Sequence, residues 1–571
     1  MRLMKSMVAM LLALAAMVGR AGESAEFRLD TMDGTRVARA VEKIAYSTAW
    51  NGGGAVNVAV DGVAIKEADA PASGDVVWNA TQATPGTRTL THTCGGETLT
   101  AVFEVPNPPS PMLTVETADW TDGTITLRCE DANVGIANAP FYNLSYFDAA
   151  KGEWRDIDRD DLLMPSPVVE VNADGVEVLV TRITDRKFAR RNNGVGTVRY
   201  RIVDDKNSAR TATRVTRNRH GLFVAVGEYE DARVKPLPTP KMECSVFKDA
   251  YVRYGKGNGI CQTLNVRPTK FVVLASLDSM VDFVVPGDIF VFYFAGHGRP
   301  GFVCCHDYNS DTGAGKITAD DLSKHLNRFC DGAGLVAVIY SCFSSGMFIQ
   351  DTAGLNSGRI GWIFSSQSNE TTRGGSLTDI LCHDGWFNGC ADVYNGEYGV
   401  GDGDGYVTFW ELAEYGYEWT SKNDYDLHRQ QMWRENTFVL GSIVAGEVPS
   451  NSADDRKWKW LAKFLSVFSS STGDVSTASV MPAANGCRTV GECYALGIDP
   501  EDPNDDFKIT DFKMENGKPV ITVNHTEDGS GESFLPRMRT LGKAELSDEW
   551  QEVPEEGNPD HRFFKVTVDL P

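Results

Sequence analysis

The sequence predicts a multidomain protein in which an α/β core, with a mostly parallel sheet and helices on both faces, is flanked by small all-β sandwich domains. Two continuous apolar runs, 289–294 and 335–340, are bounded by glycine-containing segments. Such runs are typical of parallel strands that are buried on both faces. Elsewhere, as in 56–62, apolar and polar residues alternate up to a glycine turn, which is typical of antiparallel strands.

The length and charge of the chain limit its architecture and its partners. With 571 residues, 42% of them hydrophobic, the chain can bury several cores, and about three to four domains are expected. The formal net charge of −23 disfavours nucleic acid as a partner, because a basic face could not easily offset that excess. We therefore expect a soluble, exported protein that does not bind nucleic acid.

The first residues have the layout of a secretory signal peptide, assigned to 1–25. Arg2 and Lys5 precede an apolar run at 7–18, and small residues follow it. We expect cleavage after Ala21 or Ala25. A membrane anchor is the alternative, but the run is too short to span comfortably, and no later stretch is apolar enough to be transmembrane. The sequence thus predicts export to the periplasm, the cell surface or the extracellular space.

Two β domains are predicted before the core. Residues 27–105 are expected to form a sandwich, 106–111 a stiff proline-rich linker, and 112–216 a second β domain with Asp122-Gly123 and Asp174-Gly175 at hairpin turns. Neither domain contains a catalytic constellation. We interpret them as spacers or substrate-presenting modules, with specific adhesion as the alternative.

Beyond the core, the composition shifts to Ser, Asn and Asp. Residues 448–482 are predicted to be a linker that contains a short basic amphipathic helix at 457–465. Docking of this helix on the core is favoured over contact with a membrane surface. Residues 483–571 are predicted to be a small β domain, with a hairpin turn at Asn516-Gly517.

The two apolar runs of the core each end close to a residue that can do covalent chemistry. His297 follows the first run, and Cys342 follows the second. In open α/β sheets reactive groups lie beyond the carboxyl ends of the strands, so neighbouring strands would bring this imidazole and this thiol together. A cysteine beside a histidine is an activated nucleophile.

At these residues the chain resembles the cysteine peptidases of the caspase, metacaspase, legumain and gingipain clan, in the bacterial caspase-like form. The matching motifs are Phe294-Ala295-Gly296-His297-Gly298 and Tyr340-Ser341-Cys342-Phe343-Ser344-Ser345-Gly346. Weaker matches lie at 221–227, 247–250, 361–366, 376–381 and 403–412. The resemblance covers about 218–447 and implies a caspase-like peptidase domain over that range.

The resemblance also implies roles for individual residues. Cys342 would attack the scissile carbonyl, the backbone N–H groups of Gly298 and Cys342 would stabilise the oxyanion, and His297 would protonate the leaving amine. The resemblance assigns no third residue. In the clan, the position of Tyr340 helps to form the pocket for the residue before the cut and is often Asp, Glu or Gln. A tyrosine there leaves the preferred residue open.

This mechanism requires no cofactor, but calcium is a candidate. Asp402, Asp404 and Glu411 match the second half of an EF-hand loop, whose first ligand position would fall on Val400. The alternative is a turn followed by a helix that Thr408 caps together with Glu411. Among the cysteines, Cys382 with Cys390 and Cys487 with Cys493 are candidate disulfide pairs by proximity.

Together these observations predict an exported cysteine endopeptidase that uses a Cys-His dyad. A protein of another class remains the alternative: a catalytically inactive, caspase-like surface binding or adhesion protein. A legumain-like transamidase is the second alternative.

Overall fold

The structure of the chain is a computed structural model. The residues it describes are 25–30, 42–48, 56–60, 62–70, 73–78, 86–94, 97–105, 110–131, 139–173, 175, 177–349, 358–372, 378–396, 400–422, 431–450, 452–468, 479–484, 486, 488–515, 518–525, 527, 538–543, 549, 551–552 and 563–568. The predicted signal peptide apart from Ala25, most of the proline-rich linker and the Asn516-Gly517 turn lie outside these residues.

The chain divides into two compact units. The first comprises residues 1–116, 125–186 and 199–215, and the second comprises 117–124, 187–198 and 216–571. Within the described residues, no helix is long and apolar enough to cross a membrane.

In the first unit, the described strands nearest the N-terminus form two sheets, and neighbouring strands in both sheets are antiparallel. β1 (Ala25–Asp30), β2 (Glu42–Thr48) and β5 (Ser73–Trp78) form one sheet in that order. The second sheet has the order β4 (Val63–Ala70), β3 (Val56–Val60), β6 (Gly86–Cys94) and β7 (Glu97–Val105).

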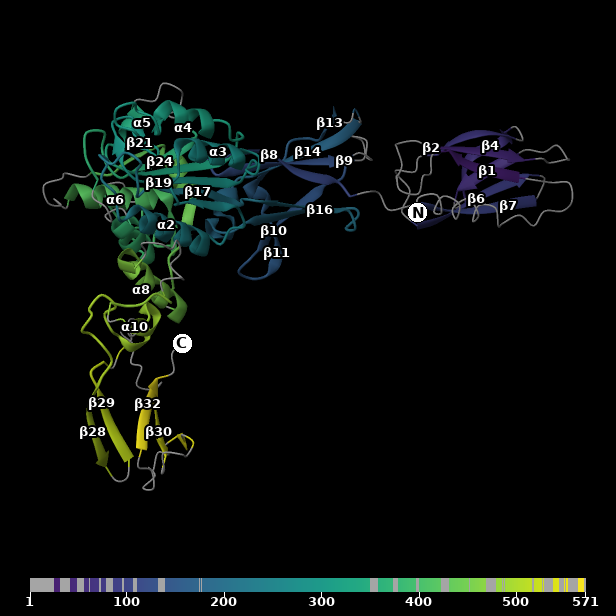
Figure 1. Cartoon of the computed structure of the whole chain (residues 1–571). Coiled ribbons are helices and arrows are strands. Elements are labelled where there is room, and N and C mark those ends of the chain that lie inside the picture. Colours follow the sequence, from purple (N-terminus) through teal and green to yellow (C-terminus); the bar gives the residue numbers. More distant parts are fainter. Residues whose placement is uncertain are drawn as a thin grey trace. The chain divides into compact units, whose positions relative to one another are not determined.

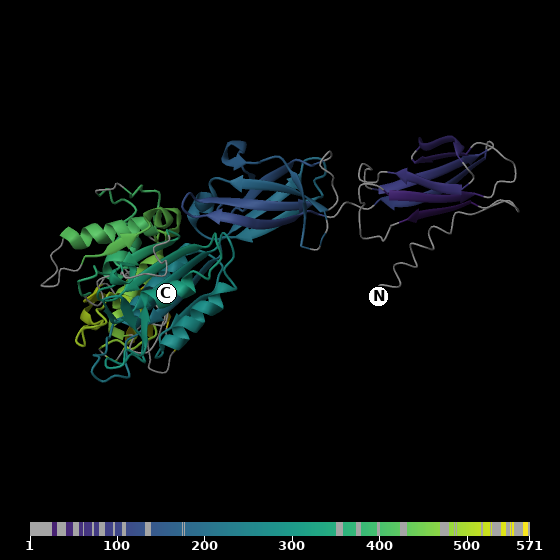
Figure 2. The ribbon, with the colours of Figure 1, turned by 90° about the horizontal axis from the view of Figure 1, so that it is seen from above.

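The strands that follow form two more sheets, drawn in blue in Figures 1 and 2. One has the order β11 (Glu153–Asp156), β10 (Tyr142–Asp148), β15 (Val198–Asp204) and β16 (Thr211–Thr216). The other has the order β12 (Leu162–Leu163), β14 (Glu177–Asp185), β9 (Thr124–Asp131) and β8 (Met112–Asp119), and β13 (Val168–Val171) also pairs with β14. Buried and partly exposed residues alternate along β9, as a sheet with one covered face requires.

A six-stranded sheet forms the centre of the second unit. Its order is β18 (Cys261–Leu264), β17 (Arg219–Ala225), β19 (Ile289–Ala295), β23 (Gly334–Tyr340), β24 (Ile360–Phe364) and β26 (Trp433–Glu435). All neighbours are parallel except β24 and β26. The prediction of an α/β core with parallel strands at 289–294 and 335–340 is therefore confirmed.

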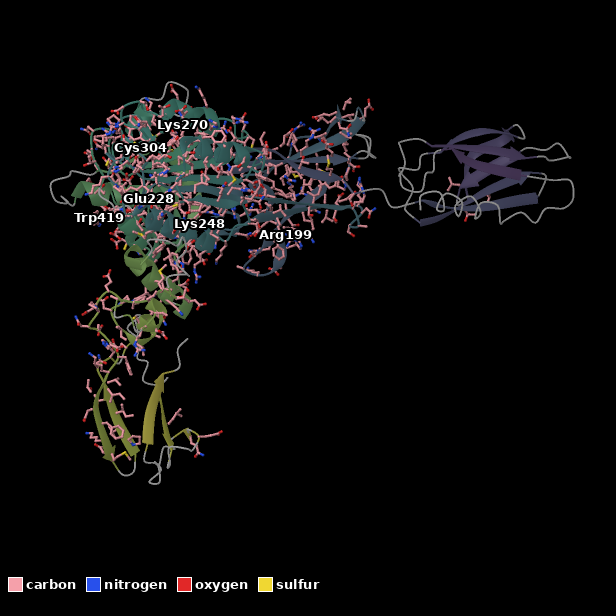
Figure 3. All side chains as sticks on the ribbon, in the orientation of Figure 1. Arg199, Glu228, Lys248, Lys270, Cys304 and Trp419 are labelled. Carbon is pink, nitrogen blue, oxygen red and sulfur yellow. The ribbon has the colours of Figure 1, made fainter. Side chains whose placement is uncertain are left out.

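Helices cover both faces of this sheet, which explains why its strands are continuously apolar. On one face, α3 (Lys270–Val281) and α4 (Ala319–Leu326) pack on side chains such as Phe292 and Ala337. On the other face lies α2 (Pro240–Gly255), whose Phe247 stacks on Tyr293 of β19 with 4.8 Å between the ring centroids. Figure 3 labels Lys270 on α3 and Lys248 on α2, above and below the sheet.

Short elements connect and extend the core of the second unit. They are β20 (Gly298–Arg299), β21 (Phe302–Cys304), β22 (Lys316–Thr318), α5 (Gly346–Ile349), the π-helix η5 (Thr378–Phe387), β25 (Tyr406–Thr408), α6 (Phe409–Lys422), α7 (Thr437–Ser442) and β27 (Val444–Glu447). β20, β21 and β22 form a small sheet, and β25 pairs with β27.

The C-terminal part of this unit begins with α8 (Ala453–Phe468), which contains the predicted amphipathic stretch. Trp458 lies 5.4 Å from Tyr254 of α2 and 4.8 Å from Phe387 of η5 between ring centroids, as expected for docking on the core. The remaining elements are α10 (Val490–Leu496), the hairpin of β28 (Ile509–Glu515) and β29 (Lys518–Val523), and a sheet of β31 (Gln551–Glu552), β30 (Met538–Lys543) and β32 (Phe563–Val568).

A buried arginine fixes the irregular segment that precedes the sheet. Arg217 is fully buried, and its guanidinium donates five hydrogen bonds to main-chain carbonyls in and beside η4 (Phe188–Gly194). The acceptors are the carbonyl oxygens of Phe188, Ala189, Arg191, Val195 and Gly196. Because the backbone of η4 is non-helical from Arg191 to Asn193, carbonyls of this segment need donors from elsewhere, and Arg217 provides them.

We expect Arg217→Met to lower the free energy of unfolding by about 3 kcal/mol or more, because it leaves several buried carbonyls without a donor. Urea unfolding followed by tryptophan fluorescence measures the change. Arg267→Met is the control, since Arg267 forms only an exposed ion pair with Glu228, and it should change stability by less than about 0.5 kcal/mol. Equal losses in the two variants would contradict this role of Arg217.

Candidate active site

The register of β19 and β23 brings the two predicted catalytic residues to one edge of the sheet. Ala295 pairs with Tyr340, and the N–H of Gly296 donates to the carbonyl of Tyr340 at 3.1 Å. His297 and Cys342 each follow the paired position by two residues. The two residues thus leave neighbouring parallel strands at the same level.

The backbone of Gly298 lies directly against that of the cysteine. A Cβ atom added at Gly298 would lie 2.4 Å from the carbonyl oxygen of Cys342 and 2.5 Å from Oγ of Ser341. No side chain larger than hydrogen fits there without moving the backbone. The approach of the His-Gly segment to the cysteine therefore requires glycine, and it brings the two predicted oxyanion donors into one small region.

Main-chain and tyrosine groups orient His297. Its Nε2 lies 2.8 Å from the carbonyl oxygen of Lys235, which can only accept, so Nε2 carries a proton and Nδ1 is the basic nitrogen of the neutral ring. The backbone N–H of His297 donates to the hydroxyl of Tyr229 at 2.8 Å, and that hydroxyl donates to the carbonyl of Val226 at 3.1 Å. The two rings are 5.1 Å apart.

Neither Lys235 nor Tyr229 was identified from the sequence. Lys235 acts through its carbonyl, which every residue has, so no residue type signals it. Tyr229 follows the end of β17 by four residues, and its place beyond a third strand end is a signal that could have been used. Burial raises the pKa of the Tyr229 phenol, so it stays protonated and can both accept and donate.

The thiol of Cys342 is half-buried and is in contact with the backbone of Thr372. The N–H of Thr372 donates to Sγ at 3.3 Å, and Sγ lies 3.9 Å from the carbonyl oxygen of the same residue. The Thr372 hydroxyl donates to the Ser341 carbonyl at 3.1 Å, and the carbonyl of Glu370 accepts from the N–H of Phe343 at 2.7 Å. Residues 370–372 thus lie across the turn that carries the thiol.

This turn has an unusual backbone. Phe343 has φ of 57°, a left-handed conformation that is rare for a bulky residue. The following serine is buried, and its Oγ donates to the carbonyl of Ser366 at 3.1 Å. These contacts hold a residue with a strained backbone directly after Cys342, and such strain is common at functional sites.

Tyr340, the predicted pocket residue, lies in a buried layer. Only 3% of it is exposed. The preceding residue, Ile339, belongs to the core cluster that contains side chains of α3 and α4. Because side chains alternate along a strand, Tyr340 lies on the opposite face of the sheet, which α2 covers. Its role in substrate binding stays a prediction.

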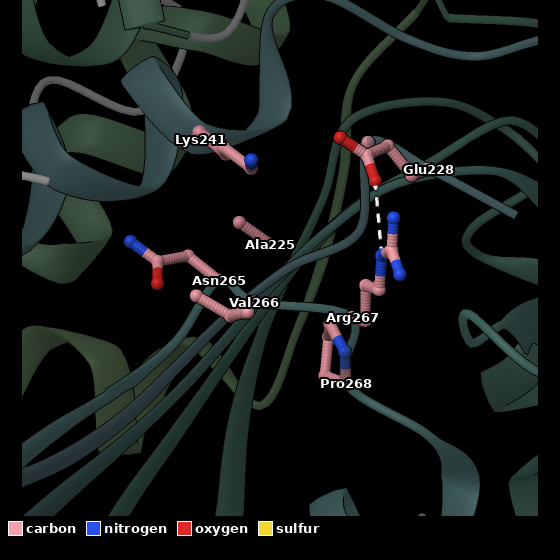
Figure 4. A pocket seen from close by; sticks show the side chains of 8 residues that line it. Ala225, Glu228, Lys241, Asn265, Val266, Arg267 and Pro268 are labelled. Carbon is pink, nitrogen blue, oxygen red and sulfur yellow. Dashed lines mark hydrogen bonds and ion pairs between the residues drawn. The ribbon is translucent and has the colours of Figure 1, made fainter. Parts of the chain in front are cut away.

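A cavity of about 290 Å³ lies at the carboxyl ends of β17 and β18 (Figure 4). It is lined by Ala225, Gly227, Glu228, Lys241, Asn265, Val266, Arg267 and Pro268. A 3.3 Å ion pair joins Arg267 to Glu228 on one side of the cavity. The lining includes neither His297 nor Cys342, so this cavity is beside the candidate catalytic pair rather than around it.

Of the predicted calcium ligands, Asp402 and Asp404 come together, and Asp392 joins them. One ligand atom from each lies within 4.8 Å of those of the other two. Glu411 instead forms a capping box: its Oε2 accepts from the N–H of Thr408 at 2.6 Å and from Oγ1 of Thr408 at 2.8 Å, while Oγ1 accepts from the N–H of Glu411 at 3.1 Å. Asp392 lies ten residues before Asp402, and nothing in the local sequence indicated it.

Of the candidate disulfide pairs, Cys382 and Cys390 are both free cysteines. Cys493 is also free, and Cys487 lies outside the described residues. Burial raises the pKa of Cys382, which is inside the π-helix η5. Spacing in the sequence gives no information on the direction of these side chains, so it could not decide between a disulfide and two free thiols.

No family model matches the chain, and no curated protein matches it. Similar solved structures include a structural-genomics protein of Geobacter sulfurreducens, with 13% identity and a TM-score of 0.26 over 39% of this chain and 97% of that one. Caspase-1 of Spodoptera frugiperda has 9% identity and a TM-score of 0.27 over 42% of this chain and 93% of that one. A structure of pro-Sf-caspase-1 has 11% identity and a TM-score of 0.24 over 38% and 87%. The α/β assignment rests on the six-stranded sheet of this chain.

The contact of Thr372 with the thiol can be tested without a substrate. Thr372→Val keeps the shape of the side chain but removes the hydroxyl that holds this segment on Ser341. The same hydroxyl also pairs with Oγ of Ser365 at 2.9 Å. We expect alkylation of Cys342 by iodoacetamide, followed by peptide mass spectrometry, to become at least about fivefold faster, which corresponds to the loss of at least one of these two hydrogen bonds. Thr372→Ser keeps the hydroxyl and should react at the parent rate. An unchanged rate in Thr372→Val would show that the hydroxyl does not restrain the segment.

Proposed function

We propose that this chain is a cysteine endopeptidase in which Cys342 is the nucleophile and His297 the general acid and base. The observation that supports this best is the packing of the two strand ends, where Gly298 lies against the backbone of Cys342. A free, partly accessible thiol and an oriented imidazole are what thiol attack on an amide requires. The motif resemblance described above supports the same reaction.

The reaction follows from the groups at this edge. The thiol proton passes to Nδ1 of His297, and the sulfur forms a bond to the carbonyl carbon of the peptide. The carbonyl oxygen becomes an oxyanion, for which the N–H groups of Gly298 and Cys342 are the candidate donors. When the C–N bond breaks, the imidazolium gives its proton to the leaving amine. Water then hydrolyses the thioester, with the same imidazole as base.

Residues 370–372 have to be displaced for this attack. In the described conformation the thiol contacts the N–H and the carbonyl of Thr372, so a peptide carbonyl would have to replace these groups at Sγ. This conformation therefore corresponds to a resting enzyme in the proposal. In the proposal, binding of a substrate displaces this segment, because the peptide backbone of the substrate also presents N–H and carbonyl groups.

The proposal predicts covalent labelling of Cys342 by peptidyl electrophiles that carry Arg, Lys, Asn or Asp before the reactive group. The parent should be labelled and Cys342→Ala should not. Cys304→Ala is the matched control: Cys304 is a free but buried cysteine near the site, so its removal should leave labelling intact. Intact-mass spectrometry measures the adduct, and the preferred peptide identifies the residue accepted before the cut.

Absence of any adduct on the parent, with iodoacetamide still reacting at Cys342, would overturn the peptidase proposal. The surface binding protein would then be the better interpretation. Labelling that persists in Cys342→Ala would also contradict the assignment, because another thiol would be the nucleophile.

Tyr229 is a positioning residue in this proposal, since it acts through the backbone of His297. Tyr229→Phe removes the acceptor of the His297 N–H, and we expect kcat/KM to fall about tenfold, mainly through kcat, with a changed pH profile. The control is Tyr254→Phe, which removes a buried hydroxyl that bonds Asp455 on α8. It should leave both the rate and the pH profile unchanged. A parent-like pH profile and kcat in Tyr229→Phe would show that this hydroxyl does not position the histidine.

A further inference from the structure

Two segments that are separate in the sequence are tied together before β25. The N–H of Gly403 donates to the carbonyl of Asp392 at 2.8 Å, and the N–H of Gly401 donates to the carbonyl of Tyr394 at 3.0 Å. A Cβ atom added at Gly401 would lie 2.5 Å from the backbone nitrogen of Tyr394, so the two backbones are in direct contact. This arrangement places Asp392 next to the acidic turn at 402–405.

The carboxylate of Asp392 is buried and only partly hydrogen-bonded. The residue is 5% exposed. Its Oδ2 accepts from the N–H of Gly405 at 3.1 Å, which directs the carboxylate toward the turn. Its Oδ1 is buried and has no hydrogen-bond partner in the described part of the chain. Leaving a carboxylate oxygen buried without a partner is unfavourable, and a bound cation would satisfy it.

The turn itself has the pattern of a calcium loop. Asp402 and Asp404 occupy the third and fifth positions of an EF-hand loop, and Gly405, with φ of +85°, occupies the sixth, where the loop turns sharply. Residues 406–408 form β25, which pairs with β27 and fixes the exit from the loop. Glu411 occupies the twelfth position, in the first turn of α6.

The first position of this loop has no side chain that can bind a cation. In sequence it falls on Val400, whose side chain has no donor atom. In space, a carboxylate from outside the loop is present instead, because Asp392 has an oxygen within 4.8 Å of ligand atoms of Asp402 and Asp404. The missing ligand is thus supplied by a residue from the preceding segment.

We propose that Asp392, Asp402 and Asp404 bind one calcium ion, with Glu411 as a further carboxylate at the edge of the site. The ligand set contains only oxygen atoms, which suits hard cations and not zinc. Calcium is favoured over magnesium because it accepts irregular sets of six to eight oxygens, whereas magnesium demands a near-ideal octahedron. The site is independent of the peptidase proposal.

The electrostatics of the cluster favour a bound cation. Burial raises the pKa of Asp392, and the negative charges of Asp404 and Asp402 add to the effect. Burial also raises the pKa of Asp404, and the charge of Asp402 adds to the effect. The hydrogen bond from the N–H of Tyr406 and the charge of the exposed Arg190 offset only part of this increase. Burial raises the pKa of Glu411 to about 7, and Asp402 and Asp392 contribute. A divalent cation would relieve this accumulation of like charges.

The test compares the full-length parent with Asp392→Asn, Asp404→Asn and the control Asp282→Asn, which changes an exposed carboxylate at the end of α3. Each protein is stripped with EGTA, and its thermal unfolding is then measured with added CaCl2 or MgCl2. Calcium at about a hundred times its dissociation constant should raise the Tm of the parent and of Asp282→Asn by about 5–10 °C. Asp392→Asn and Asp404→Asn should bind calcium at least about tenfold more weakly, measured by calorimetry.

Terbium luminescence provides a second measurement on the same proteins. Tb³⁺ substitutes for calcium, and Tyr406 in the seventh position of the loop should sensitise its emission. The parent should give calcium-reversible emission, which Asp404→Asn and Tyr406→Phe should reduce.

The metal-free state separates this proposal from a purely structural role of the carboxylates. In EGTA, Asp404→Asn should unfold at the parent temperature or above it, because it removes like-charge repulsion from an exposed position. If Asp392→Asn does not fold, Asp404→Asn decides the question. The proposal is overturned if calcium up to about 10 mM leaves the Tm of the parent unchanged, or if both variants retain the full calcium-dependent shift.

Discussion

The parallel register between β19 and β23 is the constraint on which the candidate site depends. Ala295 pairs with Tyr340, so the residues two positions further on are brought to the same level beyond the sheet. A slip by one residue would turn every side chain of a strand to the opposite face. Helices α2 and α3 cover opposite faces, so such a slip would disturb both cores at once. The register is therefore held by the packing of the whole unit, and Gly298 permits the close approach at its end.

The candidate site is assembled from the loops that follow four parallel strands. Tyr229 and Lys235 follow β17, His297 follows β19, Cys342 follows β23, and Thr372 follows β24. Because the four strands are adjacent and parallel, their carboxyl ends meet at one side of the sheet. The scaffold thus assembles an oriented imidazole, a thiol and a covering segment from residues spread over about 140 positions of the chain.

The features of the site that depend on residue type could be predicted from the sequence. Those that depend on main-chain contacts between distant segments could not. The apolar runs predicted the buried strands, and the order of His297 and Cys342 predicted the shared edge, because both follow from local pattern. The carbonyl of Lys235 and the N–H of Thr372 could not be predicted, since main-chain groups have no residue signature. The pocket role of Tyr340 comes from the resemblance and stays a prediction, while the alternation of faces along β23 places its side chain on the face that α2 covers.

The acidic turn illustrates why two interpretations of one motif need not exclude each other. The helix-capping interpretation of Glu411 describes its Oε2, which accepts both hydrogen bonds from Thr408. A carboxylate has two oxygens, so the capping box does not exhaust the capacity of this group to bind a cation. What the sequence could not provide was the third acidic residue, because Asp392 reaches the turn only through contacts between two backbone segments. The capping box would then fix the start of α6, and with it the position of Glu411, before any cation is bound.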